Sequence, residues 1–513
     1  MSSGGLGTVG LATAGLGTQD LGLLALATSA VVLVAVAAVR LSARSGLPSL
    51  VLYLGLGLLI GERGLGLRFD DAALAGVLGY AGLVVILAEG GLTTRWSTIR
   101  PVVLPAAVLA TLGTAVSVVV TAAGARLVLG LGWTDALLLG AVVSSTDAAA
   151  VFSVLRRVPL PRRLTGLLEA ESGFNDAPAV LLVVTLTERA LGRAASPWWL
   201  LLGEAVLELA VGAVVGLAVG RAGAVALRRV ALPSSGLYPI AVLALAGAAY
   251  GAADVLHGSG FLATYLAGLV LGNVRLPHGA VVRGVAEAAG WIAQIGLFVL
   301  LGLLADPARL PARVLPAVAI GLFLVLLARP ASVAASVSWF RIGWRQQVFL
   351  SWAGLRGAVP IVLATIPLSR GVPGALAVFD LVLLIVIVLT LAQGPSLGWV
   401  ARRAGLAGDL TTAALDVESS PLGAIDADVL TVRIGPGSRL HGVELFELRL
   451  PSRANVTLVV RDGEAFVPSP RSVLRHGDEL IVVAAATVRD ATEQRLREVS
   501  GAGKLAGWRP PPS

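Results

Sequence analysis

The chain has 513 residues, of which 56% are hydrophobic and only 14% are charged, and its mean hydropathy is +0.87. Soluble globular proteins carry about 25% charged residues, so this composition excludes a soluble enzyme, a disordered chain and a secreted disulfide scaffold. With no cysteine, the chain can form neither a disulfide nor a thiolate metal site. The long apolar stretches indicate a polytopic helical membrane protein.

The formal net charge of +8 does not indicate nucleic-acid binding. Residues 402–513 carry 14 basic and 14 acidic side chains, so this part is neutral. Residues 1–401 carry 25 basic against 17 acidic side chains, and the excess lies mainly in short loops between apolar runs. Such charges report membrane topology rather than binding to a polyanion.

Apolar runs between polar breaks predict an all-α transmembrane domain over residues 20–401, preceded by a flexible leader at 1–19. About thirteen spans are expected, near 20–39, 48–61, 72–93, 102–123, 133–155, 164–187, 199–220, 236–253, 259–273, 284–303, 311–328, 347–368 and 374–400.

Alternate loops differ in their arginine content, which predicts the orientation of the chain. The loops after the odd-numbered spans hold 18 arginines, Arg329 among them, and the other loops hold 8. The positive-inside rule therefore predicts a cell-membrane protein with its N-terminus outside and its C-terminal domain in the cytoplasm.

The composition changes after the last apolar run. Residues 402–426 read as a polar linker, and residues 427–500 as a small cytosolic α+β domain. Its β-branched runs at 429–434, 456–461 and 480–484 are separated by turn signals such as Asp462-Gly463. These runs are too short to cross a membrane as helices. Residues 501–513 are expected to be disordered.

Four consecutive polar residues interrupt the fifth span, where residues 144–147 read Ser-Ser-Thr-Asp. An ionisable side chain inside a span costs about 2.5–3.5 kcal/mol by insertion scales, so Asp147 is a functional candidate. The structural alternative is hydroxyl bonding within the helix and one packed carboxylate. Asp380, in the last span, is left open.

The sixth span carries a denser polar cluster, Glu171-Ser172-Gly173-Phe174-Asn175-Asp176. Ser172 and Asp176 are four residues apart and share a helix face. Pro178 removes a backbone donor and frees a carbonyl. Carboxylate, hydroxyl and carbonyl oxygens are the hard ligands that a small monovalent cation requires, so a proton and a cation can compete for Asp176.

Arg356 lies in the twelfth span, within Gly354-Leu355-Arg356-Gly357-Ala358-Val359. An arginine keeps its charge and must be paired in hydrocarbon, and Glu171 is the expected partner. The alternative is an arginine that snorkels to an interface. The fifth and twelfth spans, both interrupted, predict an inverted-repeat transporter with broken helices.

These segments resemble three signatures of the NhaP-like branch of the monovalent cation:proton antiporter superfamily. Residues 145–151 (STDAAAV) resemble its fifth-helix motif, 171–176 (ESGFND) its sixth-helix motif, and 354–359 (GLRGAV) its late-helix motif. The tail resembles the C-terminal lobe of potassium-transport regulatory domains, termed RCK_C or TrkA-C, through Leu450-Pro451 and Gly477-Asp478.

The resemblance implies an NhaA-like fold, a homodimer and alternating access. It implies an ion site with Asp176 as the main carboxylate, surrounded by Asp147, Ser172 and the backbone of Thr146. Asn175, where other branches have aspartate, marks electroneutral exchange. The Glu171–Arg356 pair also fits the family pattern, and Glu89 occupies the position of an auxiliary carboxylate.

The chain is therefore expected to be a transporter rather than an enzyme, with no cofactor other than the transported K⁺ or Na⁺ and H⁺. The tail favours K⁺, and the combination of the transmembrane domain with this tail resembles potassium/proton antiporters of the cell-volume-regulation type. The Na⁺/H⁺ alternative stays open. The expected partners are membrane lipid, a second copy, and a small-molecule or nucleotide regulator at the tail, with no nucleic acid.

Two other classes fit less well. An intramembrane aspartyl protease needs a Gly-x-Gly-Asp motif, which neither Asp147 nor Asp176 has. A gated cation channel would need a selectivity filter of the Thr-Val-Gly-Tyr-Gly type, which the sequence lacks.

Overall fold

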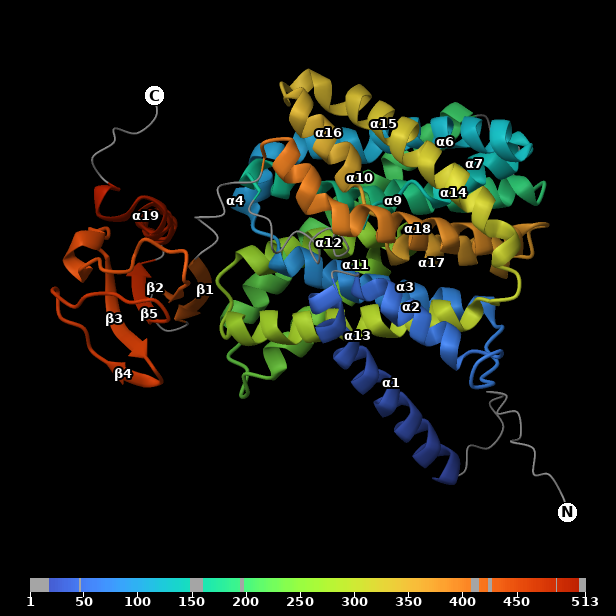
Figure 1. Ribbon diagram of the computed structural model, residues 1–513. Helices are drawn as coiled ribbons and strands as arrows, with labels where there is room; N and C mark the ends of the chain where they lie inside the picture. The colour runs from blue at the N-terminus through green and yellow to red at the C-terminus, as the bar shows by residue number, and fades with distance from the viewer. Residues whose placement is uncertain are drawn as a thin grey trace, which may run out of the picture. The chain divides into compact units, whose positions relative to one another are not determined.

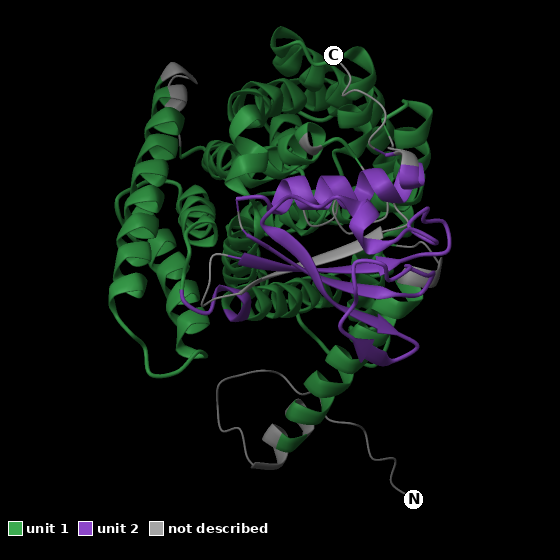
Figure 2. Cartoon of the chain, turned by 90° about the vertical axis from the view of Figure 1, so that its left-hand side faces the viewer, with its two compact units in different colours: residues 1–276, 282–406 green, residues 277–281, 407–513 purple. Residues whose placement is uncertain are grey.

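The computed structural model describes residues 18–45, 48–147, 160–193, 198–406, 415–422, 427–485 and 487–506. Three predicted segments lie partly outside the described residues. They are the leader up to residue 17, the second half of the fifth span from residue 148, and the predicted disordered tail from residue 507. The chain divides into two units, residues 1–276 with 282–406, and residues 277–281 with 407–513. Figure 2 colours them separately.

The first unit is helical. Its helices are α1 (Thr18–Ser45), α2 (Ser49–Ile60), α3 (Ala72–Thr93), α4 (Trp96–Ile99), α5 (Val103–Val108), α6 (Thr114–Leu129), α7 (Trp133–Val142), α9 (Arg162–Ala190), α10 (Trp198–Arg229), α11 (Leu237–Val255), α12 (Gly260–Asn273), α13 (Gly279–Leu304), α14 (Val314–Phe323), α15 (Arg329–Val337), α16 (Trp344–Ala353), α17 (Ala358–Ser369) and α18 (Ala375–Arg403).

Within the described residues, eight helices are long and apolar enough to cross a membrane, or nine if the bent pair α16–α17 forms one span. Three shorter apolar helices, α2, α7 and α12, and the more polar α9 coincide with further predicted spans. The prediction of a polytopic helical membrane protein is confirmed. The count of thirteen spans is not confirmed and stays a prediction.

The helices associate in two groups joined at a shared boundary (Figure 1). In one group, helix α12 packs against α3, α10 and α11. In the other group, α9 packs against α5 and α7, and α18 packs against α14 and α17. The groups meet where α17 contacts α3 and where α12 contacts α9. Helix α9, which carries the densest polar cluster of the sequence, therefore lies at the boundary between the groups.

Two parts of the helix group that contains α9 and α18 show the same departures from a regular α-helix. A π-helical turn at Leu109–Gly113 interrupts the helical stretch 96–129, and another at Leu324–Ala328 interrupts the stretch 311–340. A non-helical stretch follows in both cases. Helix α7 ends at Val142 and residues 143–147 are not helical, and residues 354–357 separate α16 from α17 with a bend of 53°. This pattern agrees with the predicted inverted repeat.

The second unit contains an antiparallel sheet of β1 (Leu415–Leu422), β2 (Ala427–Ile434), β3 (Ala454–Arg461), β4 (Glu464–Phe466) and β5 (Glu479–Ala485), in the order β1-β2-β5-β3-β4. Helix α19 (Arg489–Ala502) contributes Leu496 and Val499 to the apolar core beneath it. Asp462 and Gly463, both with positive φ, join β3 to β4. They form the two-residue hairpin turn that the sequence predicts.

The predicted boundaries of this unit need correction. The predicted linker 402–426 includes β1, which pairs with β2 from Leu415 to Leu422, so the sheet begins earlier than expected. The predicted disordered segment 501–513 includes the end of α19 and a short 3₁₀ turn at Gly503–Leu505. The alternation of buried and half-buried residues in β5 explains why the strands themselves were predictable.

Candidate functional site

Two non-helical stretches, 143–147 after α7 and 354–357 between α16 and α17, are bonded to each other inside the helical unit. The Asp147 N–H donates to the Leu355 carbonyl at 3.0 Å, and Arg356 Nη1 donates to the Ser145 carbonyl at 3.0 Å. Breaking a helix leaves backbone groups without intrahelical partners, and in an apolar interior such groups must bond elsewhere. Here each non-helical stretch donates a hydrogen bond to a backbone carbonyl of the other stretch.

Gly357 allows the two stretches to approach. A Cβ atom at this position would lie 1.7 Å from Oδ2 of Asp147, so only glycine leaves room for the carboxylate. The same Oδ2 accepts the N–H of Ala358, the first residue of α17, at 3.3 Å. The positive end of the α17 dipole therefore faces the Asp147 carboxylate and stabilises its charge.

The predicted ion-site residues form one hydrogen-bonded cluster with α9. Thr146 Oγ1 lies 3.1 Å from Ser172 Oγ and accepts the Asn175 amide at 2.6 Å. Asp176 accepts a hydrogen bond from the Ser145 hydroxyl at 2.5 Å. Asp147 lies within electrostatic range of Asp176. The structure thus brings together Asp147, Thr146, Ser172, Asn175 and Asp176.

All of these side chains are buried, with Asp147 8% and Asp176 5% exposed. Burying polar groups in an apolar medium is costly unless they are bonded, and burying a carboxylate costs more. A cluster of two carboxylates and several hydroxyl and amide oxygens at this depth fits a site that exchanges a small cation for a proton.

Ser145 belongs to the cluster although the sequence did not single it out as a ligand. Its hydroxyl, fully buried, is the one that contacts Asp176. The neighbouring Ser144 instead donates to the carbonyl of Ala141 at 2.7 Å, within its own turn. The run of four polar residues was the signal, but it does not distinguish which serine faces α9.

The predicted ion pair between Glu171 and Arg356 is wrong. Glu171 pairs with Arg329, whose Nη1 and Nη2 lie 2.5 Å and 2.8 Å from its two carboxylate oxygens. The sequence placed Arg329 in a loop because the apolar run ends there, but the helical stretch continues to residue 340. The small residues from Ala331 to Ser336 were a signal that the span continues.

Arg356 is 1% exposed and forms no ion pair with another described residue. Its guanidinium donates to the Ser145 carbonyl and lies within electrostatic range of the Glu171 carboxylate, and its own carbonyl accepts the Thr390 hydroxyl at 3.0 Å. Arg356 therefore links the non-helical stretches 143–147 and 354–357 by a hydrogen bond and is not the direct ion-pair partner of Glu171.

Glu89 lies on α3, half-buried, and its side chain packs against α13, since a Cβ on Gly290 would lie 3.1 Å from its Cγ. Its role as an auxiliary carboxylate stays a prediction.

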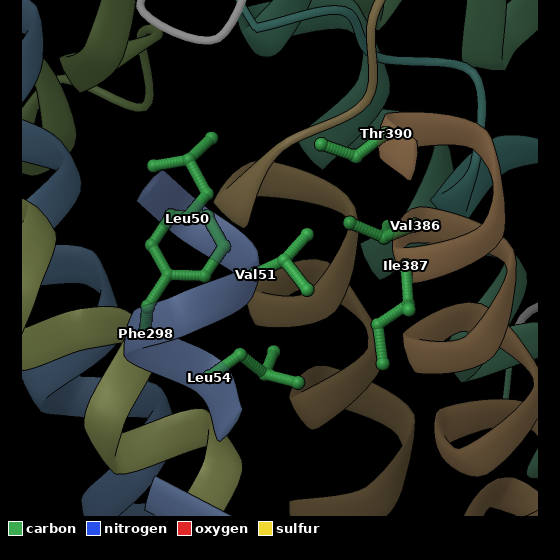
Figure 3. A pocket seen from close by; sticks show the side chains of 7 residues that line it. All are labelled: Leu50, Val51, Leu54, Phe298, Val386, Ile387 and Thr390. Carbon is green, nitrogen blue, oxygen red and sulfur yellow. The ribbon is translucent and has the colours of Figure 1, made fainter. Parts of the chain in front are cut away.

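A small apolar crevice between α2, α13 and α18 is separate from the polar cluster. It is lined by Leu50, Val51, Leu54, Phe298, Val386, Ile387 and Thr390 (Figure 3). Thr390 is its one polar lining residue, and its hydroxyl is engaged by Arg356. The crevice offers no charged ligand, so the buried cluster is the better candidate site.

Comparison with known proteins shows the family of the chain. Residues 29–403 match the model of the transmembrane sodium/hydrogen exchanger family, and residues 429–496 match the TrkA-C domain. The chain is 37% identical over 453 residues to the K(+)/H(+) antiporter NhaP of Alkalimonas amylolytica, covering 87% of this chain and 78% of that protein.

Two further similarities are informative. The K(+)/H(+) antiporter NhaP2 of Shewanella oneidensis is 37% identical over 450 residues, covering 86% of this chain and 78% of that protein. The structure of the sodium proton antiporter MjNhaP1 from Methanocaldococcus jannaschii covers 75% of this chain and all of its own, with a TM-score of 0.62 and 23% identity, a likeness of fold. The chain thus belongs to the sodium/hydrogen exchanger family of cation/proton antiporters and carries a TrkA-C domain.

Proposed function

We propose that the protein exchanges K⁺ for H⁺ across the cell membrane, one for one, at the cluster around Asp176. The observation that carries the proposal is the hydrogen bond from the Ser145 hydroxyl to the buried Asp176 carboxylate, beside Asp147 and the two non-helical stretches 143–147 and 354–357 that bond to each other. Such an exchange would serve pH, cation and volume homeostasis.

The mechanism follows from what Asp176 can bind. A proton on the carboxylate neutralises it, and a cation does the same from a position among the surrounding oxygens. The two cargoes compete because one carboxylate charge serves both. The Ser145 hydroxyl can rotate, so its oxygen lone pair can face a cation once its proton turns away from Asp176. Asn175 positions Thr146 through its amide.

Potassium is favoured over sodium by the relatives at 37% identity, whose names specify K⁺/H⁺ antiport. The likeness to the sodium proton antiporter MjNhaP1 concerns the fold. Na⁺/H⁺ exchange at the same cluster is the alternative function, and a regulated channel is a remote one.

The finer points of the proposal rest on sequence pattern and resemblance. Without Arg329, which is buried, the loops after the odd-numbered spans hold 17 arginines against 8 in the others, so the positive-inside rule still predicts a cytoplasmic C-terminal unit. A homodimer is proposed from the family resemblance. The TrkA-C domain is proposed to bind a small-molecule or nucleotide regulator, and Glu89 to assist the ion site.

The test measures exchange in everted membrane vesicles with a pH-sensitive dye, on adding K⁺, Na⁺ or Li⁺ in turn. Saturable, ΔpH-driven dequenching strongest with K⁺ is expected. Asp176→Asn should abolish it while the protein still inserts, because an amide neither releases a proton nor neutralises a cation. Substantial exchange by a well-expressed Asp176→Asn variant, or flux that does not saturate, would contradict the proposal.

A further inference from the structure

One carboxylate on α9 is left unused by the cluster. Glu169, Gly173 and Asp176 are spaced by four and three residues, so they share one face of the helix. Glu169 lies nearer the end at Arg162, about 10 Å along the axis from Asp176 at 1.5 Å per residue. It is half-buried and forms no hydrogen bond or ion pair with another residue that the structure describes.

The groups that face Glu169 come from other helices. Arg95 is the charged residue within electrostatic range of its carboxylate, and the Tyr265 hydroxyl on α12 is the other titratable group near it. Arg95 lies in the turn between α3 and α4. Glu169 therefore lies between α9 and the α3–α12 group, at the boundary that the two helix groups share.

The Tyr265 hydroxyl is buried and unsatisfied. The residue is 3% exposed, and its hydroxyl has no hydrogen-bond partner among the described residues. Thr94 lies near it and donates its own proton to the Gly90 carbonyl at 2.6 Å, so Thr94 can only accept from the Tyr265 hydroxyl, and the lone pairs of the Tyr265 oxygen stay open to a ligand. A buried hydroxyl without a partner costs about 1–3 kcal/mol, so it marks a place where a polar ligand is missing.

The ring of Tyr265 lies against α9 at Gly173, a position between Glu169 and Asp176 along the helix. It meets Phe174 edge-on, with ring centroids 5.8 Å apart. A Cβ atom on Gly173 would lie 2.6 Å from the ring, so only a glycine there lets the ring lie against α9. Because Gly173 falls between the two carboxylates on their shared face, the ring covers the path between them.

We propose that the Glu169 carboxylate and the Tyr265 hydroxyl form a second, transient binding site for the transported monovalent cation, on the side of Asp176 toward Arg162. Both groups offer oxygen ligands, and the Tyr265 ring divides this outer site from the inner one. The inference rests on the proposed function, since it concerns the path of the same cargo. The arginine count predicts that the outer site opens to the cytoplasm.

An outer site of this kind affects the two directions of transport unequally. A cation that enters from the Arg162 end meets Glu169 first, and its local concentration is raised by the attraction of the carboxylate. A cation that enters from the opposite side reaches Asp176 without passing Glu169. The apparent affinity for the cation should therefore depend on Glu169 from one side only.

The experiment uses the full-length protein in everted vesicles and in right-side-out vesicles, with K⁺ as the probe. In everted vesicles, Glu169→Gln should raise the half-saturating K⁺ concentration about three- to tenfold, as expected for a charge lost about 10 Å from the inner site. The maximal rate should change little. In right-side-out vesicles the half-saturating concentration should stay at the wild-type value.

Two further variants separate the proposal from simpler explanations. Glu287→Gln removes the same charge from an exposed position on α13, eight residues from the start of that helix, and should have no effect. Tyr265→Phe keeps the ring, removes the unsatisfied hydroxyl, and should raise the half-saturating concentration from the same side as Glu169→Gln.

The outcomes that would overturn the outer site are distinct from those that would overturn the antiporter. The outer site is contradicted if the half-saturating K⁺ concentration shifts equally from both sides, or if neither Glu169→Gln nor Tyr265→Phe shifts it. The same shift in Glu287→Gln would also contradict it, because the effect would then be one of surface charge. Absence of ΔpH-driven exchange by the unaltered protein would instead contradict the proposed function.

Discussion

The two aspartates of the cluster are held by different kinds of donor. Asp147 accepts a backbone N–H at the start of α17, whose direction is fixed by the helix. Asp176 accepts the hydroxyl of Ser145, which can rotate about its C–O bond. Of the two, Asp176 is therefore the carboxylate whose hydrogen bond can be released when a cargo binds.

Ser145→Ala should weaken cation binding without stopping exchange. The substitution removes the hydroxyl oxygen that, in the proposed mechanism, faces the bound cation. If that contact is worth as much as a hydrogen bond to a charged group, about 1.5–3 kcal/mol, the half-saturating K⁺ concentration should rise about tenfold or more. The adjacent Ser144→Ala is the matched control, because Ser144 bonds within its own turn. Equal effects of the two substitutions on dye dequenching would show that Ser145 has no special role.

The Glu171–Arg329 pair should behave as a coupled unit. Removing one partner of a buried pair strands the other charge and costs about 3–5 kcal/mol. Glu171→Gln and Arg329→Met should each lower the free energy of unfolding, and the double variant should recover part of the loss. Thermal unfolding in detergent measures the coupling. Coupling between Glu171 and Arg356, with none to Arg329, would restore the pairing predicted from sequence.

The sequence identifies the members of the cluster but not all of their contacts. Asp147 and Asp176 stand out because a charge in an apolar run has few structural explanations. The partner of Glu171 depends on the register between helices that are 158 residues apart, and no spacing rule encodes that register. An arginine at the edge of an apolar run, such as Arg329, looks like a loop residue in a hydropathy reading.

An ion pair connects helix α18 to the loop between α13 and α14. Arg309 Nε donates to Oδ2 of Asp380 at 2.9 Å, and Asp380 is 2% exposed. Arg63 donates to Asp306 at 2.9 Å on the surface. This pairing explains Asp380, whose role the sequence left open, as a structural ion pair.

The Arg309–Asp380 pair and the surface Arg63–Asp306 pair should differ in their effect on stability. Arg309→Ala leaves the buried Asp380 uncompensated and should lower the free energy of unfolding by about 3–5 kcal/mol. Arg63→Ala removes an exposed partner of Asp306 and should cost about 0–1 kcal/mol. Thermal unfolding in detergent would test the contrast, and Asp380→Asn in the Arg309→Ala background should restore part of the loss. Similar costs for both arginines would contradict it.

Most helices and strands were predictable, because apolar runs and alternating residues are local signals. The π-helical turns at 109–113 and 324–328 were not, because their sequences, Leu-Ala-Thr-Leu-Gly and Leu-Val-Leu-Leu-Ala, have no signature that separates them from ordinary α-helix. The early start of the sheet at β1 was missed for a related reason, since β1 contains Glu418, Ser419, Ser420 and Pro421 and lacks the β-branched pattern.

The whole molecule combines two units with separate cores. The residues of the ion cluster all precede residue 180, and their supporting contacts end at Thr390. The sheet unit has its own apolar core, which includes Leu430, Val482 and Leu496. A ligand of the sheet unit can therefore affect transport only by favouring one state of the transporter over another.

Truncation after about residue 405, just beyond the end of α18 at Arg403, should leave the order of preference among K⁺, Na⁺ and Li⁺ unchanged. The pH profile or the maximal rate should shift instead, because the regulatory bias is lost. Dye dequenching with each cation measures both. A reversed order of the cations in a stably inserted truncation would mean that the sheet unit shapes the ion site.

The charges buried around the proposed ion site have a consequence for leakage of ions through the carrier. Three buried carboxylates, Asp147, Glu171 and Asp176, are opposed by two buried guanidinium groups, Arg329 and Arg356, in the described part of this region. One negative charge is thus left over, and either a proton or a monovalent cation cancels it. The empty carrier is the costly state in a low dielectric, so its return without cargo is suppressed. Slippage should be rare, and the membrane voltage does no net work on a carrier that crosses neutral in both directions.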